Sequence, residues 1–492
     1  MHSRLRARVS RLVVYTHRWL GIALGALFAA WFVSGVVMMY VGMPSLPSTE
    51  RLQRSRILDF SGATISPSDA ARTAGGPLGS VRLSMLEGRP LYRLRTGGSV
   101  SSVFADDGQP LGRLSRDAAL RVARAFAPEQ AASARYDEYL TAPDQWTLEA
   151  RQQLPMHRIA LGDAGDSRLY ISERSGEVVL KTTAASRRWA YPGAILHWIY
   201  LTPIRRHAEV WAQLIIWTSG VGTVMSIVGF AWGIWRYSPM ERYRLRRVRS
   251  HSPYSGWMWW HHYGGLVFGV FTITWIFSGL LSMDPWDWHP GTSPSATVRL
   301  AFAGGPFKAE TLSVADLRHA LVLAAGAREA EVVQSQGHLW LATDRGVVPL
   351  TDHSSGLPLE PDAVQRLAQS AMPGVSISEI SRLDDYDSYY YDRTRNLPLP
   401  VYRVRYDDDV QTWLYVDAAR GAVLRKEERL TRLNRWLYHG LHSLDFPFLY
   451  YRRPLWDLVV IALSAGGLFL TLATALPVYR RARRHVRHFL SR

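Results

Sequence analysis

H17-R-W-L-G21-I-A-L-G25-A-L-F-A-A-W31-F-V-S34-G35 is the stretch that decides the fold, because a close copy of it appears in the second half of the chain. The copy reads H261-H-Y-G-G265-L-V-F-G269-V-F-T-I-T-W275-I-F-S278-G279. At an offset of 244 residues the same residue type recurs for His17, Gly21, Gly25, Trp31, Ser34 and Gly35. Both stretches are almost wholly apolar, which is typical of helices that cross a membrane.

A second set of matches lies further along the chain, at an offset of 245 residues. The residues of the first half that recur there are Pro155, Arg158, Tyr170, Gly176, Arg187, Leu196, His197, Trp211, Ser219 and Gly222. The two offsets differ by one residue and nearly halve the 492-residue chain, so the pattern predicts a duplication. The first helix of each half is expected to run in the same direction. The repeats are therefore predicted to be parallel, with a pseudo-twofold axis along the membrane normal.

Four apolar segments are long enough to cross about 30 Å of hydrocarbon. They predict transmembrane helices at 12–41, 208–235, 257–283 and 455–478. The first segment is too long for a secretory signal and lacks a small-residue cleavage site, so it is predicted to be an anchor. Arginines cluster beside these segments, and positive charge is retained on the cytoplasmic side. We therefore place the tails 1–11 and 479–492 and the basic loop 236–256 in the cytoplasm.

The remaining segments are predicted to lie outside, in the periplasm if the membrane is the inner membrane of a Gram-negative cell. They form two lobes, 42–190 and 284–436. Each lobe is followed by a segment that contains a proline and is predicted to lie along the outer membrane surface, at 191–207 and 437–454.

Each lobe has the sequence pattern of a small α+β unit. In the second lobe, residues 400–406, 412–417 and 421–424 alternate apolar and polar side chains, which predicts hairpin strands. Residues 115–127 and 361–371 are predicted to be amphipathic helices. Residues 61–80 and 290–306 are rich in Gly, Pro and Ser and are predicted to be linkers. The predicted fold class is a membrane α+β protein with four transmembrane helices in two parallel pseudo-symmetric repeats.

The composition limits which partners and cofactors the protein can have. The chain has 58 Lys and Arg against 41 Asp and Glu, a net charge of +17, which raises nucleic acid as a possible partner. The arginines crowd beside the apolar segments, however, which argues against nucleic acid and indicates cytoplasmic flanks of membrane helices. There is no cysteine. Disulfides, thiolate ligands, iron–sulfur clusters and covalent haem attachment are therefore excluded. A redox cofactor would have to be held by histidine, methionine or non-covalent contacts.

Two pairs of histidines match across the halves, out of sixteen histidines in the chain. His17 and His261 lie at the inner ends of their helices, and His197 and His442 precede the second helix of each half. One pair at each membrane face suits two haem groups, each held between two imidazoles. Such iron is low-spin and has no open position, so it serves electron transfer. The matching glycines leave a flat face beside His17 and His261 on which a macrocycle can lie.

Other readings of these residues stay open. A histidine at a membrane boundary commonly serves the interface, and the G-x-x-x-G spacing commonly serves helix packing. The symmetry favours ligation, because an ionisable residue repeated at the membrane boundary in both halves is hard to treat as incidental. His262 and His439 are alternatives to His261 and His442, respectively.

Five arginines are candidates to neutralise haem propionates, although each is equally well explained as a solvated surface residue: Arg18, Arg158, Arg187, Arg403 and Arg432. The sequence has no dinucleotide-binding fingerprint after a strand, no phosphate-binding loop and no zinc motif. Its cytoplasmic parts are too short for a flavin or nicotinamide domain, so an electron donor has to come from elsewhere.

Several runs resemble the PepSY-associated transmembrane proteins, which include iron-regulated membrane proteins and periplasmic ferric-siderophore reductases. The runs are H17-R-W-L-G, L196-H197-W, R435-W-L-Y-H-G-L-H442-S-L-D-F and the P-V-Y-R-V…Y-V-D…G signature. The resemblance spans essentially the whole chain. It implies PepSY-like periplasmic lobes, b-type haem and reduction of a ferric complex, with the family's histidines falling on His17, His197, His261 and His442. The lobes are long for the family, and the H-G-L-H run is reduced to G-A-I-L-H in the first half.

The leading hypothesis is a haem b-dependent ferric reductase of the inner membrane that holds two haems. Quinol or a cytoplasmic reductase would donate the electrons, and a ferric siderophore or another Fe(III) complex would accept them. The alternative hypothesis is a non-redox protein whose lobes bind or inhibit a periplasmic peptidase. A transporter of an iron chelate ranks last, because the helices offer little polar surface at mid-membrane.

Overall fold

The computed structural model describes residues 2–75, 78–96, 99–245, 248–350, 356–392 and 394–490. The chain forms two compact units, each assembled from segments of both halves. We call them the helical unit (Met1–Met43, Ser186–His289, Leu433–Arg492) and the sheet unit (Pro44–Ala185, Pro290–Arg432).

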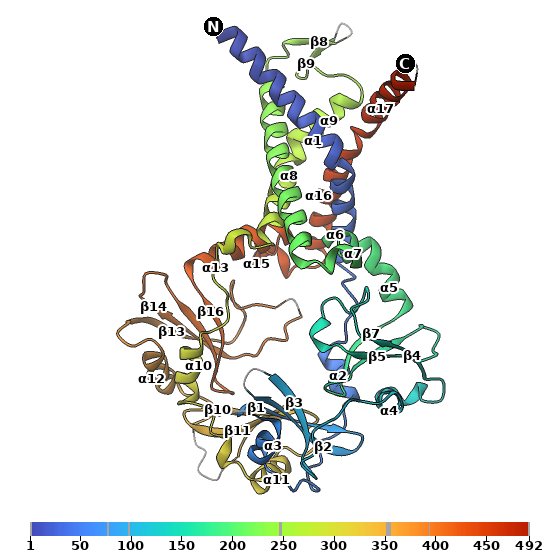
Figure 1. Cartoon of the computed structure of the whole chain (residues 1–492). Helices are drawn as coiled ribbons and strands as arrows, with labels where there is room; N and C mark the ends of the chain where they lie inside the picture. Colours follow the sequence, from blue (N-terminus) through green and yellow to red (C-terminus); the bar gives the residue numbers. More distant parts are fainter. Residues whose placement is uncertain are drawn as a thin grey trace. The chain divides into compact units, whose positions relative to one another are not determined.

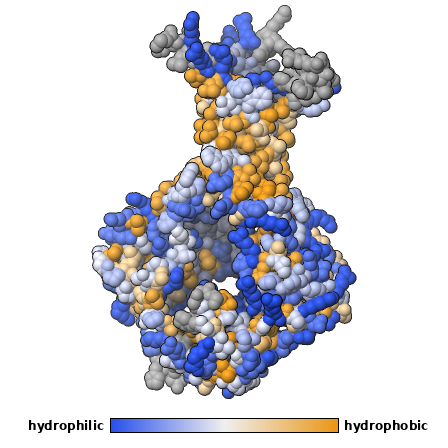
Figure 2. Space-filling view, viewed as in Figure 1, coloured by the Kyte–Doolittle hydropathy of each residue, from blue (hydrophilic) through white to orange (hydrophobic). Residues whose placement is uncertain are grey.

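Four long helices build the helical unit (Figure 1): α1 (His2–Met38), α8 (Ala208–Arg236), α9 (Trp257–Leu281) and α16 (Leu455–Leu472). All are long and apolar enough to cross a membrane. Each packs against two others, so that α1, α8, α9 and α16 close into a ring. On the face seen in Figure 2, the surface of these helices is predominantly hydrophobic. Lipid, not water, is the solvent that such a surface requires.

Both predicted cytoplasmic tails are largely helical. Helix α1 begins at His2 and includes most of the predicted tail 1–11, while α17 (Ala475–Leu490) covers most of 479–492. Arginine is a good helix former, and neither tail contains a breaker that would end the helix at the membrane boundary. The predicted basic loop contains a short hairpin of β8 (Tyr243–Leu245) and β9 (Val248–Ser250).

Short helical pieces join the sheet unit to the long helices. In the first half they are α5 (Ala184–Ala190), the π-helical turn η3 (Tyr191–Ile195), α6 (Leu196–Trp198) and α7 (Thr202–Arg205). In the second half they are α13 (Arg429–Asn434), the π-helical turn η6 (Arg435–Gly440), α14 (Leu441–Ser443) and α15 (Pro447–Tyr450). The segments 191–207 and 437–454, predicted to lie along the membrane surface, also pack on the long helices. In the first half α6 and η3 pack on α1, and in the second half α14 and η6 pack on α9.

Within the described residues, the sheet unit contains three antiparallel sheets. The first-half sheet has the order β4 (Arg135–Leu140), β5 (Met156–Ala160), β6 (Arg168–Ser172), β7 (Val178–Thr182). The second-half sheet has the order β13 (Ile377–Leu383), β14 (Val401–Tyr406), β15 (Trp413–Asp417), β16 (Ala422–Glu427). Helices α4 (Arg116–Phe126) and α12 (Pro361–Ala371) contribute buried alanines to the cores of these two sheets. The strands and helices predicted for these regions are confirmed.

The third sheet joins the halves. Its order is β12 (Gly346–Pro349), β11 (His338–Thr343), β10 (Ala330–Ser335), β1 (Leu78–Leu86), β2 (Arg89–Thr96), β3 (Ser99–Phe104). Strands β1 and β10 pair antiparallel, with Val81 opposite Val332. The expectation of two separate lobes at 42–190 and 284–436 is therefore wrong. A strand pattern indicates which side chains are buried, but it does not indicate which strand is the partner.

The two predicted linkers are also wrong, since each contains a helix: α3 (Pro67–Ala74) lies within 61–80, and α10 (Ala296–Ala303) lies within 290–306. Ser66 and Ser295 cap the N-termini of these helices by accepting a backbone hydrogen bond. Gly75 and Gly304 end them in the left-handed conformation. The Ser, Pro and Gly residues that suggested linkers are helix caps.

Candidate functional site

The first histidine pair lies between α1 and α9. The ring centroids of His17 and His261 are 6.1 Å apart, and the rings are tilted by 37°. Each Nδ1 lies 3.0 Å from a backbone carbonyl oxygen, that of Met225 for His17 and that of Leu470 for His261. Met225 and Leu470 are themselves related by the offset of 245 residues. The contacts of the two histidines are therefore equivalent.

These hydrogen bonds fix the tautomer of both rings. A carbonyl oxygen can only accept, so each Nδ1 must carry the proton and donate it. The Nε2 atom of the same neutral ring then carries a lone pair. Within the described residues, Nε2 of His17 and Nε2 of His261 have no hydrogen-bond partner. This is the state in which an imidazole binds a metal, with the other nitrogen oriented by an acceptor.

The second pair comes from the short helices α6 and α14. The ring centroids of His197 and His442 are 6.0 Å apart, with the rings tilted by 72°. Each histidine follows a π-helical turn, and each is followed two residues later by a left-handed residue, Ile199 (φ 53°) or Leu444 (φ 50°). A β-branched residue such as Ile199 rarely adopts this conformation. π-Helical turns and strained residues of this kind cluster at functional sites.

Serine hydroxyls orient the second pair. Ser34 Oγ lies 3.0 Å from Nδ1 of His197, and Ser278 Oγ lies 3.0 Å from Nδ1 of His442. Each hydroxyl donates its own proton to a carbonyl one turn earlier in its helix, so its oxygen accepts from the imidazole. Burial lowers the pKa of His197 to about 3 and that of His442 to about 4. Both rings are therefore neutral at physiological pH, with Nδ1 protonated and the Nε2 lone pair available.

His262 has no such lone pair. Its Nδ1 lies 2.8 Å from Ser252 Oγ, and its Nε2 lies 2.8 Å from the carbonyl oxygen of Gly233. That carbonyl requires Nε2 to donate, which ties α9 to α8, and Nδ1 is engaged with Ser252 in the segment before α9. The geometry favours His261 over His262 as a ligand. At the other pair His442, not His439, lies against His197, while the His439 ring packs on Tyr438.

One glycine makes room for a histidine ring. A Cβ atom on Gly229 of α8 would lie 2.1 Å from Cε1 of His17. At Gly35 and Gly279, by contrast, a Cβ atom would make only an ordinary contact, 3.5 Å from Cε1 of His197 and 3.7 Å from Cε1 of His442, respectively. The repeat does not mark Gly229, because residue 474 at the matching position is threonine.

The predicted flat face along the G-x-x-x-G spacings is only partly present. A Cβ atom on Gly269 would lie 2.7 Å from the ring of Phe230, which already occupies that space. At Gly21, Gly25 and Gly265 a Cβ atom would meet only ordinary contacts, at 3.7 Å or more. Gly269 therefore serves helix packing, as such spacings commonly do.

An apolar layer separates the two histidine pairs. It consists of Phe28, Phe32, Met225 and Ile276, with Trp31 and Trp275 packed against them. Ser34, which contacts His197, lies roughly 25 Å along α1 from His17 at 1.5 Å per residue. The pairs are thus placed at two depths of the helix bundle.

The arginine candidates are distributed over both units. Arg158 and Arg403 belong to the sheet unit, where each forms ion pairs with carboxylates, among them Asp144 at 3.3 Å and Asp387 at 2.9 Å. Arg432 also belongs to the sheet unit and donates to the carbonyl oxygen of Gln411. The matching ion pairs of Arg158 and Arg403 give these two arginines a structural role in each half. Of the five candidates, Arg18 and Arg187 belong to the helical unit.

Both pairs have the dimensions of a bis-imidazole iron site. With iron–nitrogen bonds of about 2.0 Å and a ring centre roughly 1.1 Å behind each nitrogen, the centroids should lie about 6.2 Å apart. The observed separations are 6.1 and 6.0 Å. Among the described residues, no group of three or more His, Asp or Glu side chains is placed to hold a metal. A pair of histidines suits a metal whose other ligands belong to a macrocycle, so the donor sets fit haem.

Fold and helices define the class as a membrane protein of mixed α+β structure. Residues 14–348 match the family model of the PepSY-associated TM region, and residues 358–427 match that of the peptidase propeptide and YPEB domain. The first match covers more than half of the chain, so the protein belongs to the PepSY-associated transmembrane family. The second match runs from just before α12 through β16. No curated protein matches the chain.

Proposed function

We propose that this protein is a haem b-dependent membrane reductase that holds two haems and passes electrons across the membrane to ferric iron. The observation that carries the proposal is the occurrence of two histidine pairs, each 6 Å between centroids, in which all four rings have Nδ1 as donor. His17 and His261 would hold one haem, and His197 and His442 the other. The family match supports the membrane setting but does not specify a cofactor.

The haem supplies an iron that cycles between Fe(III) and Fe(II) by one electron when bound. The residues of the chain orient the imidazole rings and exclude water. The carbonyl oxygens and serine hydroxyls keep each ring oriented and basic at Nε2. The layer around Phe28, Phe32 and Trp275 excludes water between the two levels. If each haem were held by both imidazoles of its pair, no coordination position would remain for oxygen, which would favour electron transfer over oxygen chemistry.

We infer that the two halves are parallel repeats related by a pseudo-twofold axis along the membrane normal. Equivalent contacts support this inference. Trp211 Nε1 donates to the carbonyl of Trp198, and Trp456 Nε1 donates to that of Ser443, each matched at an offset of 245. Such an axis sets His17 against His261 and His197 against His442, each pair at one depth.

The arginine clusters support an orientation with both termini and the 236–256 loop in the cytoplasm of an inner membrane. In this orientation the sheet unit lies in the periplasm, His17 and His261 lie near the cytoplasm, and His197 and His442 lie near the periplasm. Electrons from quinol or a cytoplasmic reductase would enter at the first pair. A ferric siderophore or another Fe(III) complex would take them from the second. Reduction loosens the iron, because Fe(II) is held poorly by hard oxygen ligands.

The test is haem stoichiometry of the purified protein, measured with its optical spectrum before and after dithionite. We expect two reducible haems per chain and oxidation of the reduced protein by a ferric siderophore. His261→Ala should lower the content to one haem per chain. His262→Ala is the matched control: it removes a neighbouring buried imidazole with no free lone pair, and should retain two haems. A haem-free wild-type protein, or equal haem loss in both variants, would refute the proposal.

The second candidate is a protein that binds or inhibits a peptidase, and the observation favouring it is the match of residues 358–427 to a peptidase propeptide domain. It predicts that replacing His17 or His442 by Ala leaves activity unchanged. A haem-free protein that binds a periplasmic peptidase in saturable fashion would select this candidate.

A further inference from the structure

The sheet unit contains a cleft of about 550 Å³ whose lining is rich in arginine. It lies where strands β1 and β2 of the joint sheet meet β7, α4 and α2 (Ser48–Arg54). Its charged lining consists of eight arginines and three glutamates: Arg51, Arg54, Arg56, Arg82, Arg89, Arg93, Arg121, Arg328, Glu87, Glu177 and Glu329. A volume of this size is typical of sites for small molecules.

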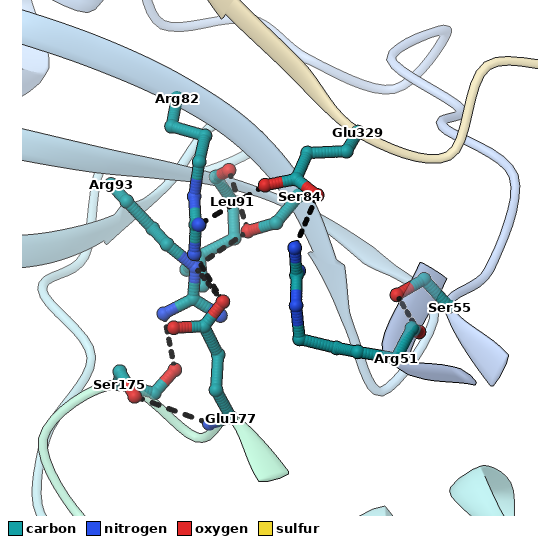
Figure 3. Close-up of polar contacts among 9 residues, drawn as sticks. All are labelled: Arg51, Ser55, Arg82, Ser84, Leu91, Arg93, Ser175, Glu177 and Glu329. Atoms are coloured by element: carbon teal, nitrogen blue, oxygen red, sulfur yellow. Dashed lines mark hydrogen bonds and ion pairs between the residues drawn. The ribbon is translucent and has the colours of Figure 1, made fainter. Parts of the chain in front are cut away.

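Figure 3 shows the centre of this cleft, where three arginines share two glutamates. Glu329 pairs with Arg51 at 2.7 Å and with Arg82 at 3.1 Å. Glu177 pairs with Arg82 and, at 3.3 Å, with Arg93. The Arg93 side chain is only 7% exposed, and it also donates to Ser84 Oγ and the Ser175 carbonyl. These contacts hold the guanidinium groups in place before any ligand arrives.

The central cluster retains positive charge. Burial and the neighbouring charges of Arg82 and Arg51 lower the pKa of Arg93 to about 10, against the opposing effect of Glu177. Arg93 therefore stays protonated at neutral pH. Three fixed cations around two carboxylates leave a net positive charge that a bound anion would offset.

Two further arginines line the cleft, and their side chains have no carboxylate partner among the described residues. The Arg328 guanidinium donates to the backbone carbonyls of Gln53, at 3.1 Å, and Ser55. Arg56 is exposed and has no hydrogen bond or ion pair within the described part of the chain. Both keep donors that can reach an anionic group, because a guanidinium has five N–H donors.

The other three arginines of the lining are largely neutralised. Arg121 pairs with Glu87, while Arg54 and Arg89 pair with carboxylates outside the cleft, those of Glu129 and of Asp106 and Asp107. A surplus of positive charge remains after all these pairs are counted. The rest of the lining is mostly apolar, with Leu86, Met85, Val122 and Phe126 among its members.

We propose that this cleft binds a small polyanion that carries two or more carboxylate or phosphate groups, either free or as the ferric complex of such a molecule. Arginine is the side chain best suited to these groups, because its planar fork binds their oxygens two at a time. The apolar lining adds contact for the carbon skeleton of the ligand. A neutral or cationic ligand would leave the surplus positive charge of the cleft uncompensated, so it should bind more weakly than an anion.

Binding can be measured by isothermal titration calorimetry on the full chain in a neutral detergent. The probes are citrate, ferric citrate and pyrophosphate, with a neutral ferric trihydroxamate as the uncharged comparison. The first variant is Arg56→Gln, because the Arg56 side chain makes no hydrogen bond or ion pair within the described residues that folding could need. The second is Arg56→Gln combined with Arg328→Gln. The control is Arg366→Gln on α12, which removes an exposed arginine outside the cleft.

We expect at least one anionic probe to bind in saturable fashion, with an affinity that falls as salt is added. Arg56→Gln should weaken binding several-fold, and the double variant by about tenfold or more. Arg366→Gln should leave it unchanged. If citrate binds and pyrophosphate does not, the site recognises carboxylate groups. If pyrophosphate binds and citrate does not, it recognises phosphate groups. If only ferric citrate binds, the ligand is the iron complex.

Two results would overturn the proposal: no saturable binding of any of the three anions, or equal affinity in the wild type and both arginine variants. Only the ferric-complex form rests on the proposed function. Calorimetry detects binding without electron transfer, so a haem-free protein that binds citrate would refute the reductase and leave the anion site standing.

Discussion

At the scale of single residues, the acceptor on Nδ1 distinguishes the four paired histidines from His262. Ser34 accepts from His197 at 3.0 Å while its own proton goes to the Ala30 carbonyl. An imidazole that donates a hydrogen bond at Nδ1 is a stronger base at Nε2 and stabilises Fe(III) relative to Fe(II). The serine should therefore lower the midpoint potential of a haem held by His197.

Ser34→Ala should raise the midpoint potential of one of the two haems. A net hydrogen-bond energy of roughly 1 kcal/mol corresponds to about 40 mV for a one-electron couple. A redox titration followed optically measures the shift. Ser226→Ala is the control, since the Ser226 hydroxyl donates only to the Gly222 carbonyl of its own helix. A fall in potential, or the same rise in both variants, would contradict the assigned hydrogen-bond direction.

The sequence could identify the histidines but not all of their acceptors. Repetition in the two halves selected His17, His197, His261 and His442, and it also marked Ser34 and Ser278. The carbonyl oxygens of Met225 and Leu470 carry no signal, because every residue has a carbonyl group and only the helix packing decides which one faces a ring. For the same reason His262 and His261 differ little in sequence, although their hydrogen bonds differ in kind.

At the scale of elements, helix α8 approaches α1 closely where Gly229 faces His17. A Cβ atom at residue 229 would lie 2.1 Å from Cε1 of the ring and 2.4 Å from Nδ1. The helix backbone cannot yield, so the imidazole would have to turn or the helices would have to separate. Either movement spoils the alignment of His17 with His261 without removing a ligand.

Gly229→Ala should therefore reduce the haem content from two to about one per chain, as replacement of His17 itself would. Gly220→Ala is a matched control on the same helix, because a Cβ atom at Gly220 meets nothing within 4 Å. It should retain both haems and slightly stabilise α8, since alanine is the better helix former. The pyridine haemochrome assay distinguishes the two variants. Full haem in Gly229→Ala would exclude His17 as a ligand in this orientation.

The periodicity of apolar residues predicted the long secondary-structure elements correctly but missed two short helices. Periodicity located the four long helices, α4, α12 and the strands β14–β16, because their buried faces recur at a fixed spacing. It missed α3 and α10, each of which has only eight residues. In so short a helix the caps occupy a large share of the sequence, and the serines and glycines hide the apolar stripe.

At the scale of the molecule, the joint sheet makes the two halves of the sheet unit interdependent. One core contains Val81, Leu83 and Leu94 from the first half together with Val332 and Leu341 from the second. Fully burying such side chains stabilises a protein by roughly 1.5–3 kcal/mol each. No alternation of apolar residues could have revealed this pairing, because β1 and β10 are separated by more than 240 residues.

Residues 290–432 expressed alone should therefore fold only in part. Strands β10, β11 and β12 lose β1 and the core that they share with the first half, and β10 is left with an exposed hydrogen-bonding edge. The sheet β13–β16 keeps its own core with α10 and α12, which includes Phe302, Val364 and Val404. Hydrogen exchange should show protected amides in β13–β16 and unprotected amides in β10–β12. Co-expression with residues 44–185 should restore protection to β10–β12, whereas protection in the isolated fragment would mean that the joint sheet is dispensable for folding.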